Sequence, residues 1–338
     1  MPGDRLRKPP TIVEIAAELG VSPSTVSRAF TAPRLLRRET VERVRAEAAR
    51  RGYVPNVHAR ALSTGVPHTI GLIVPDIANP FFPPMIRAAQ REAEQTGHTV
   101  LIADTDGDPA RERRTIDRLA PQTESLILAS SRLPSADLAE VTAKRRVLFL
   151  NRDEPRTARI LISSRDALKG AVEDLVQRGH RRFLYVAGPR GSWSDTERYG
   201  TVKVALAGVA DADLQCLRIP QGTYEQALDA GKSIVSAHAT AVIAFDDVVA
   251  HGVIDALARQ RVRIPGDVSV LGCDDTLALS TQPPLTSIAL RVTEAARLAV
   301  QLVVQARIGE VLVPQRHVLQ GEVTARATVG DAPGSAAS

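Results

Sequence analysis

The chain has 338 residues, 44% of them hydrophobic, so it is long enough to bury a sizeable core and to form two or three domains. It contains no run of roughly 18 apolar residues and begins without an apolar signal segment, so we expect a soluble, cytoplasmic protein that does not enter a membrane. Its two cysteines, Cys216 and Cys273, lack CxxC spacing, which argues against a disulfide framework and a zinc motif and predicts two small buried side chains.

The net charge of +5 is unevenly distributed along the chain. Residues 1–65 carry twelve Lys and Arg against six Asp and Glu, whereas the remainder carries 31 against 32. A charge excess is usually a solvated face, but an excess confined to one segment also indicates contacts with nucleic-acid phosphates. Residues 1–10 are expected to form a basic, disordered arm.

Two short helices joined by a tight turn are predicted over Thr11–Phe30. Thr11 and Glu14 form a capping box, and apolar residues recur at helical spacing until Gly20 ends the first helix. Helices this close cannot lie antiparallel, which predicts a helix-turn-helix whose second helix enters the DNA major groove. An αα-corner inside a larger helical domain is the alternative. The residues expected at the DNA are Thr11, Ser22, Pro23, Ser24, Thr25, Ser27 and Arg28.

A loop over residues 31–37 and a third helix over Arg38–Arg51 complete this segment, and Gly52 ends the helix. Tyr53 is expected to pack on the small core of residues 11–55. Residues 57–63, VHARALS, predict one or two helical turns, which are too short to be stable alone in water. A plain linker without function is the alternative for that stretch.

The strings VSPSTVSR, GYVPN and ARALSTG follow one another within residues 21–65, and together they closely resemble the headpiece of the lac repressor family of transcription regulators. The resemblance implies that residues 11–55 bind DNA and that residues 56–66 form a hinge helix and linker, folded when paired with the dimer mate. It also implies that Leu62 wedges between base pairs in the minor groove. Arg37 stands where the family places a capping Ser, so the cap of the third helix is lost or supplied otherwise. The hinge residues expected at the DNA are Asn56, His58, Ala59, Arg60 and Leu62.

From residue 69 onward, short apolar runs alternate with amphipathic stretches. The pattern predicts buried parallel strands separated by helices, and therefore two doubly wound α/β units in series. The resemblance implies a periplasmic-binding-protein-like effector and dimerisation core over residues 67–325, with crossing strands near residues 163, 290 and 320, before a flexible tail at 326–338. The strands are predicted at residues 70–76, 99–104, 125–130, 146–151, 182–188, 215–220, 241–246 and 268–274, with helices at 80–96, 110–119 and 136–143.

Polar residues at the ends of these strands are expected to meet in one cleft, because ligands of open α/β sheets bind beyond the carboxyl ends of the strands. Carboxylates and amides around aromatic rings suit a sugar or related polyol. The alternative is that strand-end Asp and Asn residues cap the following helices, which is the better interpretation for Asp76 and Asp247. The residues that this reasoning places in the cleft are Asp76, Asn79, Phe81, Phe82, Asn151, Asp246 and Asp274.

The resemblance extends to NPFF (79–82), TERY (196–199), AFDD (244–247) and GCDDT (272–276), and it implies effector contacts for Phe81, Phe82, Arg198, Asp246 and Asp274, with Ser192 and Ser194 in the same variable loop. Trp193 lies in that loop, where it either stacks on a sugar ring or is merely packed. Two departures from the family pattern point to an uncommon effector. Asp246 replaces the usual Asn, and Ser163–Ser164 replaces an Asp-Asn pair.

The doublets Asp246–Asp247 and Asp274–Asp275 would suit a metal or acid–base chemistry. Adjacent residues of a strand point to opposite faces, however, so each doublet is expected to place only one carboxylate in the cleft. The sequence has no Gly-rich phosphate loop, HExxH or GxSxG motif, and its seven His are scattered, so no enzyme, cofactor or metal site is predicted.

These features predict a dimeric transcription regulator, with a repressor favoured, that binds a near-palindromic operator under the control of a small-molecule effector. The choice between dimer and tetramer, and the sign of the response, stay open. The alternative is a sugar-binding protein without a DNA role, which leaves the basic headpiece unexplained.

Overall fold

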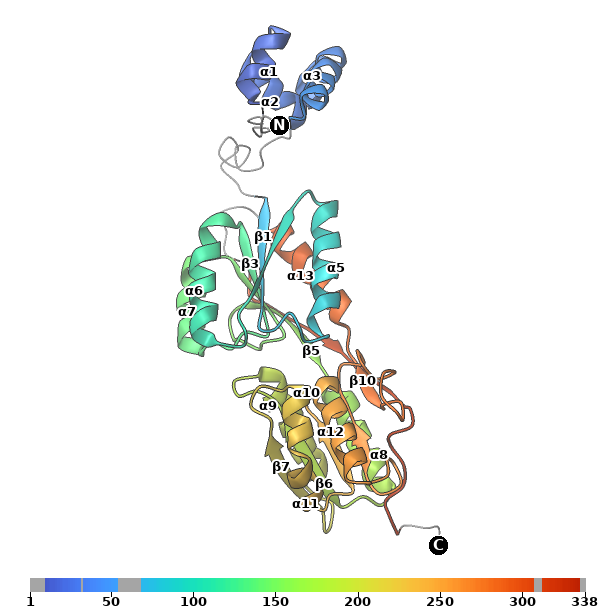
Figure 1. Cartoon of the computed structure of the whole chain (residues 1–338). Coiled ribbons are helices and arrows are strands. Elements are labelled where there is room, and N and C mark those ends of the chain that lie inside the picture. Colours follow the sequence, from blue (N-terminus) through green and yellow to red (C-terminus); the bar gives the residue numbers. More distant parts are fainter. Residues whose placement is uncertain (1–9, 32, 54–67, 307–311, 335–338) are drawn as a thin grey trace. The chain divides into compact units, whose positions relative to one another are not determined.

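The computed structural model describes residues 10–31, 33–53, 68–306 and 312–334, which belong to two compact units, Met1–Pro67 and His68–Ser338 (Figure 1). We call these units the headpiece and the core. No helix among the described residues is both long enough and apolar enough to cross a bilayer.

The headpiece contains α1 (Ile12–Leu19), α2 (Pro23–Thr31), the 3-10 helix η1 (Pro33–Leu35) and α3 (Arg38–Arg51). The predicted capping box is present, because the Thr11 amide donates to Glu14 Oε2 at 2.7 Å and the Glu14 amide donates to Thr11 Oγ1 at 3.3 Å. Gly20 adopts a left-handed φ of 65°, which ends α1 and turns the chain directly into α2. The predicted helix pair is confirmed, although the expected loop at 31–37 includes η1.

The three helices share one small core. Ile15 of α1, Val26 of α2 and Val44 of α3 are each at most 1% exposed, and they pack together at its centre. Tyr53 packs against Phe30 with ring centroids 6.0 Å apart, as predicted. Arg37 precedes α3, and its side chain makes no capping hydrogen bond. The side-chain cap at the start of this helix is therefore lost.

The first half of the core is a six-stranded parallel sheet in the order β11-β5-β4-β3-β1-β2. Helices α5 (Phe82–Gln95) and α13 (Val292–Gln305) cover one face, and α6 (Pro109–Leu119), followed by the 3-10 helix η2 (Ala120–Gln122), and α7 (Ser135–Lys144) cover the other (Figure 1). The strands are β1 (Thr69–Val74), β2 (Thr99–Asp104), β3 (Ser125–Ala129), β4 (Val147–Leu150), β5 (Ala158–Ser163) and β11 (Gln315–Gln320).

The second half is a four-stranded parallel sheet in the order β7-β6-β8-β9. Helices α8 (Arg165–Gln177) and α9 (Trp193–Leu206) pack on one face, while α10 (Tyr224–Asp229), α11 (Gly231–Ser236) and α12 (Asp247–Arg259) pack on the other. The strands are β6 (Arg182–Ala187), β7 (Asp213–Arg218), β8 (Ala241–Ala244) and β9 (Ser269–Leu271). The two doubly wound units are therefore confirmed.

The chain passes between the two halves near the positions that the family resemblance implied. It leaves the first half after β5, returns from β10 (Ser287–Ala289) into α13, and leaves again from β11 into β12 (Glu322–Thr324). β10 and β12 pair antiparallel, and the Gly321 amide donates to the Ser163 carbonyl at 2.8 Å, which ties two of the crossings together. Apolar periodicity alone missed β5, β10, β11 and β12. β10 and β12 have three residues each and β11 is partly exposed, so none of these three carries a continuous buried apolar run. β5 is buried, but its apolar run is only the three residues 160–162.

Two strands that were predicted as buried are sheet edges. β2 and β7 each have a single hydrogen-bonded neighbour among the described strands, and their side chains are partly exposed. Cys216 lies in β7 and is exposed, so the prediction that it is buried is wrong, whereas Cys273 is buried as predicted. The sequence pattern of an edge strand resembles that of its buried neighbours, and the order of strands decides exposure.

The expectation of a flexible tail beginning at residue 326 is also wrong. Thr328 is fully buried, and its Oγ1 donates to the Val270 carbonyl at 2.6 Å and accepts from the Thr286 amide at 2.8 Å. Further on, the Gly330 amide donates to Ser269 Oγ at 3.0 Å and the Ala332 amide to the Arg178 carbonyl at 2.9 Å. Small residues are typical of tails, but here their backbone completes the edge of the four-stranded sheet.

Replacing Thr328 with Val should therefore destabilise the core. The change keeps the shape but leaves the Thr286 amide without its buried acceptor, which costs about 1–3 kcal/mol. Urea unfolding of the full chain measures the loss, and Thr99→Val, at an exposed position of β2, is the matched control. Equal stability of the two variants would contradict a contribution of the Thr328 hydroxyl to the stability of the core.

Candidate functional site

Apart from Thr11, the predicted DNA-contacting residues of the headpiece lie on α2 or directly before it, with Arg28 in the last turn of the helix. Ser22, Pro23, Ser24 and Arg28 are exposed, while Thr25 and Ser27 are half-buried. Ser22 Oγ accepts from the Thr25 amide at 3.1 Å and also lies 2.9 Å from the Thr25 hydroxyl, so it caps the helix as predicted. A helix N-terminus carries a partial positive charge and amide donors, which suits a phosphate contact beside the groove.

Thr11 is exposed, but its hydroxyl is used in the cap of α1. The hinge residues Asn56, His58, Ala59, Arg60 and Leu62 lie outside the described residues, and so does most of the predicted arm.

A cavity of about 420 Å³ lies between the two halves of the core, at the carboxyl ends of the parallel strands. Asp76 and Asn151 come from the first half, and Arg198 and Asp274 come from the second. Trp193 is not among the lining residues, so stacking on a ligand in this cavity is not supported. The predicted residues that line it are Asp76, Asn79, Phe81, Phe82, Asn151, Ser192, Ser194, Arg198, Asp246 and Asp274.

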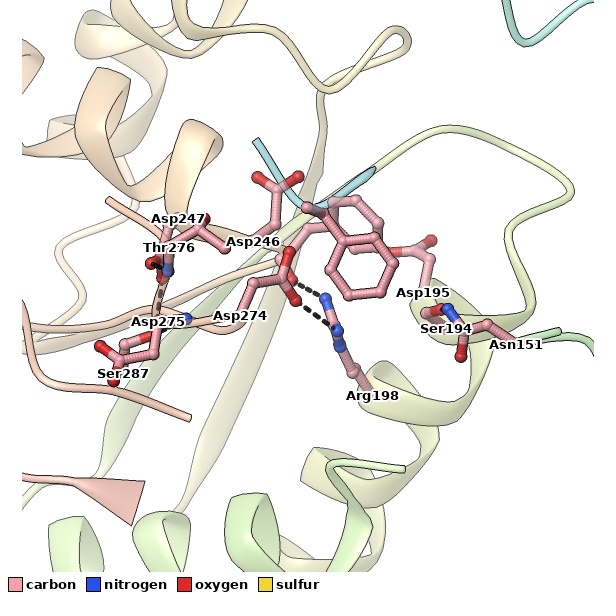
Figure 2. Close-up of polar contacts among 12 residues, drawn as sticks. Asn151, Ser194, Asp195, Arg198, Asp246, Asp247, Asp274, Asp275, Thr276 and Ser287 are labelled. Carbon is pink, nitrogen blue, oxygen red and sulfur yellow. Dashed lines mark hydrogen bonds and ion pairs between the residues drawn. The ribbon is translucent and has the colours of Figure 1, made fainter. Parts of the chain in front are cut away.

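A buried ion pair forms part of the cavity wall. Arg198 Nη2 donates to Asp274 Oδ1 at 2.9 Å, and both side chains are at most 6% exposed (Figure 2). Arg198 Nη1 donates to the Phe245 carbonyl, and its guanidinium lies 5.1 Å from the centroid of the Phe245 ring. Burial raises the pKa of Asp274, and the charge of Arg198 opposes that rise. The pair therefore offers a fixed, oriented set of donors and acceptors beside the ligand space.

Asp246 joins the two halves of the core. Its Oδ1 accepts from the Val249 amide at 2.8 Å and so caps α12, while its Oδ2 accepts from Asn79 Nδ2 of the other half at 3.1 Å. Burial raises the pKa of Asp246 to about 6. A carboxyl group that gains a proton near neutral pH is able to donate a hydrogen bond to a ligand as well as accept one.

The capping interpretation is wrong for both residues that it favoured. Asp247 does not cap α12, because its carboxylate accepts from Ser287 Oγ and from the amides of Thr276 and Leu277 (Figure 2). Asp76 accepts from the Ala78 amide at 2.8 Å, two residues on, which is a local turn and no helix cap.

One carboxylate of each Asp doublet faces the cavity, as predicted, but for a different reason. β8 ends at Ala244 and β9 ends at Leu271, so neither doublet lies on a strand and alternation does not apply. Asp274 adopts a φ of 110°, and its amide donates to the Ile288 carbonyl at 2.9 Å. Asp275 pairs with Arg326 at 2.6 Å.

Asn151 provides an acceptor for a ligand. It adopts a left-handed φ of 58°, and its Nδ2 donates to Ser130 Oγ at 3.1 Å and to Ser194 Oγ at 2.9 Å. Its Oδ1 is buried and has no hydrogen-bond partner among the described residues. Buried acceptors are rarely left unpaired, so this oxygen is suited to a ligand hydroxyl.

Arg132 is a charged cavity residue that sequence reasoning missed. It follows β3 in a loop and lines the cavity, and its Nη1 is buried without a partner in the described part of the chain. Burial lowers the pKa of Arg132, while Glu112, Asp195 and Asp246 oppose that change. The sequence did offer a signal for Arg132, because it follows the end of a predicted strand. The same kind of position led to the prediction of Asn151. The other missed lining residues include Ser130, Asp106, Phe245 and residues 220–223.

Comparison with known proteins gives matches over both units. Residues 11–56 match the family model of bacterial regulatory proteins, lacI family, and residues 172–329 match the periplasmic binding protein-like domain. The HTH-type transcriptional repressor CytR of Escherichia coli (strain K12) is 30% identical over 315 residues, which are 89% of this chain and 90% of that protein.

Two solved structures are similar along nearly the whole chain. The lac repressor dimer bound to operator and the anti-inducer ONPF is 25% identical, with a TM-score of 0.85 over 96% of this chain and 100% of that one. The complex of the transcriptional regulator CelR with cellobiose is 25% identical, with a TM-score of 0.69 over 94% of this chain and 99% of that one.

The raised pKa of Asp246 predicts a pH dependence of stability. Its folded-state pKa of about 6 exceeds the ordinary value of 3.8, so the stability that it contributes is full below about pH 4 and is lost as the pH rises through 6. Relative to Asp246→Asn, wild type should lose up to about 3 kcal/mol between these limits, because each pKa unit corresponds to about 1.4 kcal/mol.

Urea unfolding across that pH range measures the difference in the free energy of unfolding. The bond to Asn79 that Asp246→Asn loses shifts this difference by a constant amount and does not change its dependence on pH. Asp267→Asn is the control, since its hydrogen bond with Arg263 lowers the pKa of Asp267 to about 2 and its contribution is lost as the pH falls. A wild-type curve parallel to that of Asp246→Asn would contradict the raised pKa.

Proposed function

The chain belongs to the lacI family of DNA-binding transcriptional regulators, and from this we propose that it is a repressor whose operator affinity is set by a small polyhydroxylated effector in the core cavity. Its relatives are transcriptional regulators and not enzymes. The alternative of a sugar-binding protein without a DNA role is not supported, because residues 11–56 match the family's DNA-binding segment.

The headpiece supports the DNA half of the proposal. α2 presents exposed hydroxyl groups at its start and the exposed Arg28 in its last turn. The capped helix α1 precedes it through a tight turn and packs against it in the headpiece core. We propose that two headpieces of a homodimer place these helices in successive major grooves of a near-palindromic operator, with Leu62 of each chain at the centre. The similar lac repressor structure is a dimer on its operator.

The cavity supports the effector half, and the observation that carries it is the pairing of polar groups across the two halves of the core. Asn79 bonds to Asp246, and Asn151 bonds to Ser194, so the two hydrogen bonds that close the cavity join different subdomains. An effector that binds these groups changes the contacts between the subdomains. Carboxylates, amides and the rings of Phe81 and Phe82 fit a sugar or related polyol, and similar CelR was solved with cellobiose.

DNA binding should be strongly salt-dependent and should depend on Arg28. About six to ten phosphate contacts imply a loss of roughly 10³–10⁵ in affinity between about 50 and 200 mM salt. On a near-palindromic site selected from random DNA, Arg28→Ala should weaken binding and reduce the log–log salt slope by about 1. Fluorescence anisotropy at several salt concentrations measures both quantities.

Arg45→Ala is the control for charge, because Arg45 is exposed on α3 and its loss removes the same charge from the headpiece. A salt-independent affinity would contradict phosphate-driven binding. Equal effects of the two variants would contradict the assignment of α2 as the helix that reads the groove.

The effector response should be lost when the buried ion pair is removed as a pair. Removing one partner alone would leave a buried charge and cost about 3–5 kcal/mol of stability, so Arg198→Met is combined with Asp274→Asn. A thermal-shift screen of sugars and polyols first identifies a ligand, which at 100 times its Kd stabilises wild type by about 2.7 kcal/mol. The double variant should lose that shift and should still bind operator DNA.

Arg263→Met with Asp267→Asn is the matched control, because that pair is exposed and lies away from the cavity. Calorimetry of the effector with free and with operator-bound wild type then tests the coupling, since the ratio of the two affinities must equal the effect of effector on operator affinity. Equal affinities would mean that the cavity binds a ligand without controlling DNA binding.

A further inference from the structure

Three side chains with metal-ligating atoms meet at the amino ends of neighbouring strands in the six-stranded sheet. The cavity lies at the opposite, carboxyl ends of these strands. His98 precedes β2, His68 precedes β1 and Glu124 precedes β3, and these strands are neighbours in the sheet. The Thr99 amide donates to the His68 carbonyl at 2.9 Å, and the Glu124 amide donates to the Thr69 carbonyl at 2.7 Å. The parallel ladder therefore fixes the three backbones side by side.

The ligating atoms of these residues are close together. One atom from each of His68, His98 and Glu124 lies within 4.8 Å of the other two, and His98 Nε2 is 3.6 Å from Glu124 Oε2. The side chains of His98 and Glu124 are each 8% exposed. A tetrahedral Zn²⁺ with bonds of about 2.0–2.2 Å places its ligand atoms roughly 3.4 Å apart, so the His98–Glu124 pair already has the required spacing.

The hydrogen bonds of His98 direct a lone pair toward Glu124. Thr96 Oγ1 donates to the Ala93 carbonyl at 3.0 Å, so it accepts from His98 Nδ1, which lies 2.9 Å away. His98 Nδ1 is also 3.0 Å from the Thr96 carbonyl, a second acceptor. In the neutral ring, Nδ1 then carries the proton and Nε2 faces a carboxylate oxygen with its lone pair. Two acceptors facing each other favour a cation between them, and this orientation of the second ring nitrogen is typical of metal-binding histidines.

The carboxylate of Glu124 is also oriented from behind. Arg146 Nη1 donates to Glu124 Oε1 at 3.2 Å, and Arg146 Nη2 is anchored by the carbonyls of Val303 and Ala306 at 3.1 Å each. Arg146 therefore holds one oxygen and leaves Oε2 turned to His98. The ring of His68 contacts that of His98 with centroids 5.2 Å apart, and no hydrogen bond to another described residue holds it in place.

We propose that His68, His98 and Glu124 bind one divalent transition-metal ion of the Zn²⁺ type, with water in the fourth position. Imidazole nitrogens select this class of ion over Mg²⁺ and Ca²⁺, which prefer oxygen ligands alone. None of the three residues lines the core cavity, so the metal site is separate from the effector site. His68 is the first residue of the core unit, and bound metal would fasten the start of β1 to its two neighbouring strands.

Isothermal titration of ZnCl₂ into untagged full-length protein tests the site. Wild type should bind one Zn²⁺ per chain and should melt at a higher temperature with the metal bound. His98→Gln and Glu124→Gln should each weaken binding by about ten-fold or more, as expected when a ligand or its orienting group is lost. Glu124→Gln retains an acceptor for Arg146, and His68→Gln provides a variant at the edge of the unit if His98→Gln does not fold.

His238→Asn is the matched control, because His238 is exposed in the other half of the core and its left-handed φ of 49° suits Asn. It should bind Zn²⁺ as wild type does, and excess Mg²⁺ should not compete. The proposal is overturned if wild type shows no saturable binding, which would leave His98 and Glu124 as a contact between side chains only. It is equally overturned if His68→Gln and Glu124→Gln bind as wild type does.

Discussion

The buried pair of Arg198 and Asp274 is the interaction on which the cavity depends. Taking two charges out of water costs several kcal/mol per ion, so each charge of the pair depends on the other to remain buried. Arg198 donates to the Phe245 carbonyl as well as to Asp274, while its Nε is buried without a hydrogen-bond partner among the described residues. The backbone of Asp274 adopts a φ of 110° beside it. This arrangement fixes a charged wall at the strand ends, against which the rest of the cavity is built.

The remaining cavity walls come from two halves of the core, and each half has its own hydrophobic clusters. The three chain crossings beside β10 and β12 connect the halves in addition to the polar bonds of Asn79 and Asn151. A connection of this kind resists separation less than a shared apolar core does. The molecule therefore has the parts needed for a ligand to change the contact between two rigid bodies, which is the physical content of our proposal for its regulation.

The six-stranded sheet carries different side chains at the carboxyl ends and at the amino ends of its strands. Its carboxyl ends supply Asp76, Asn79 and Asn151 to the cavity, while its amino ends bring His68, His98 and Glu124 together. Both sets arise because neighbouring parallel strands begin together and end together. Residues far apart in sequence therefore become neighbours at the same end of the strands. The two sites share a scaffold without sharing a residue.

The sequence by itself determined the features that depend on neighbours along the chain: the capping box of Thr11, the helix-turn-helix spacing, and the alternation of apolar strands with helices in the core. These are local because hydrogen bonds and periodicity act within a few residues. Only the tertiary structure decided which strands are edges, that Thr328 is buried, and that Asp246 caps α12 in place of Asp247. It alone brought Arg132 to the cavity and the two histidines to Glu124, because burial and the approach of distant side chains are set by how the elements pack, which no short segment encodes.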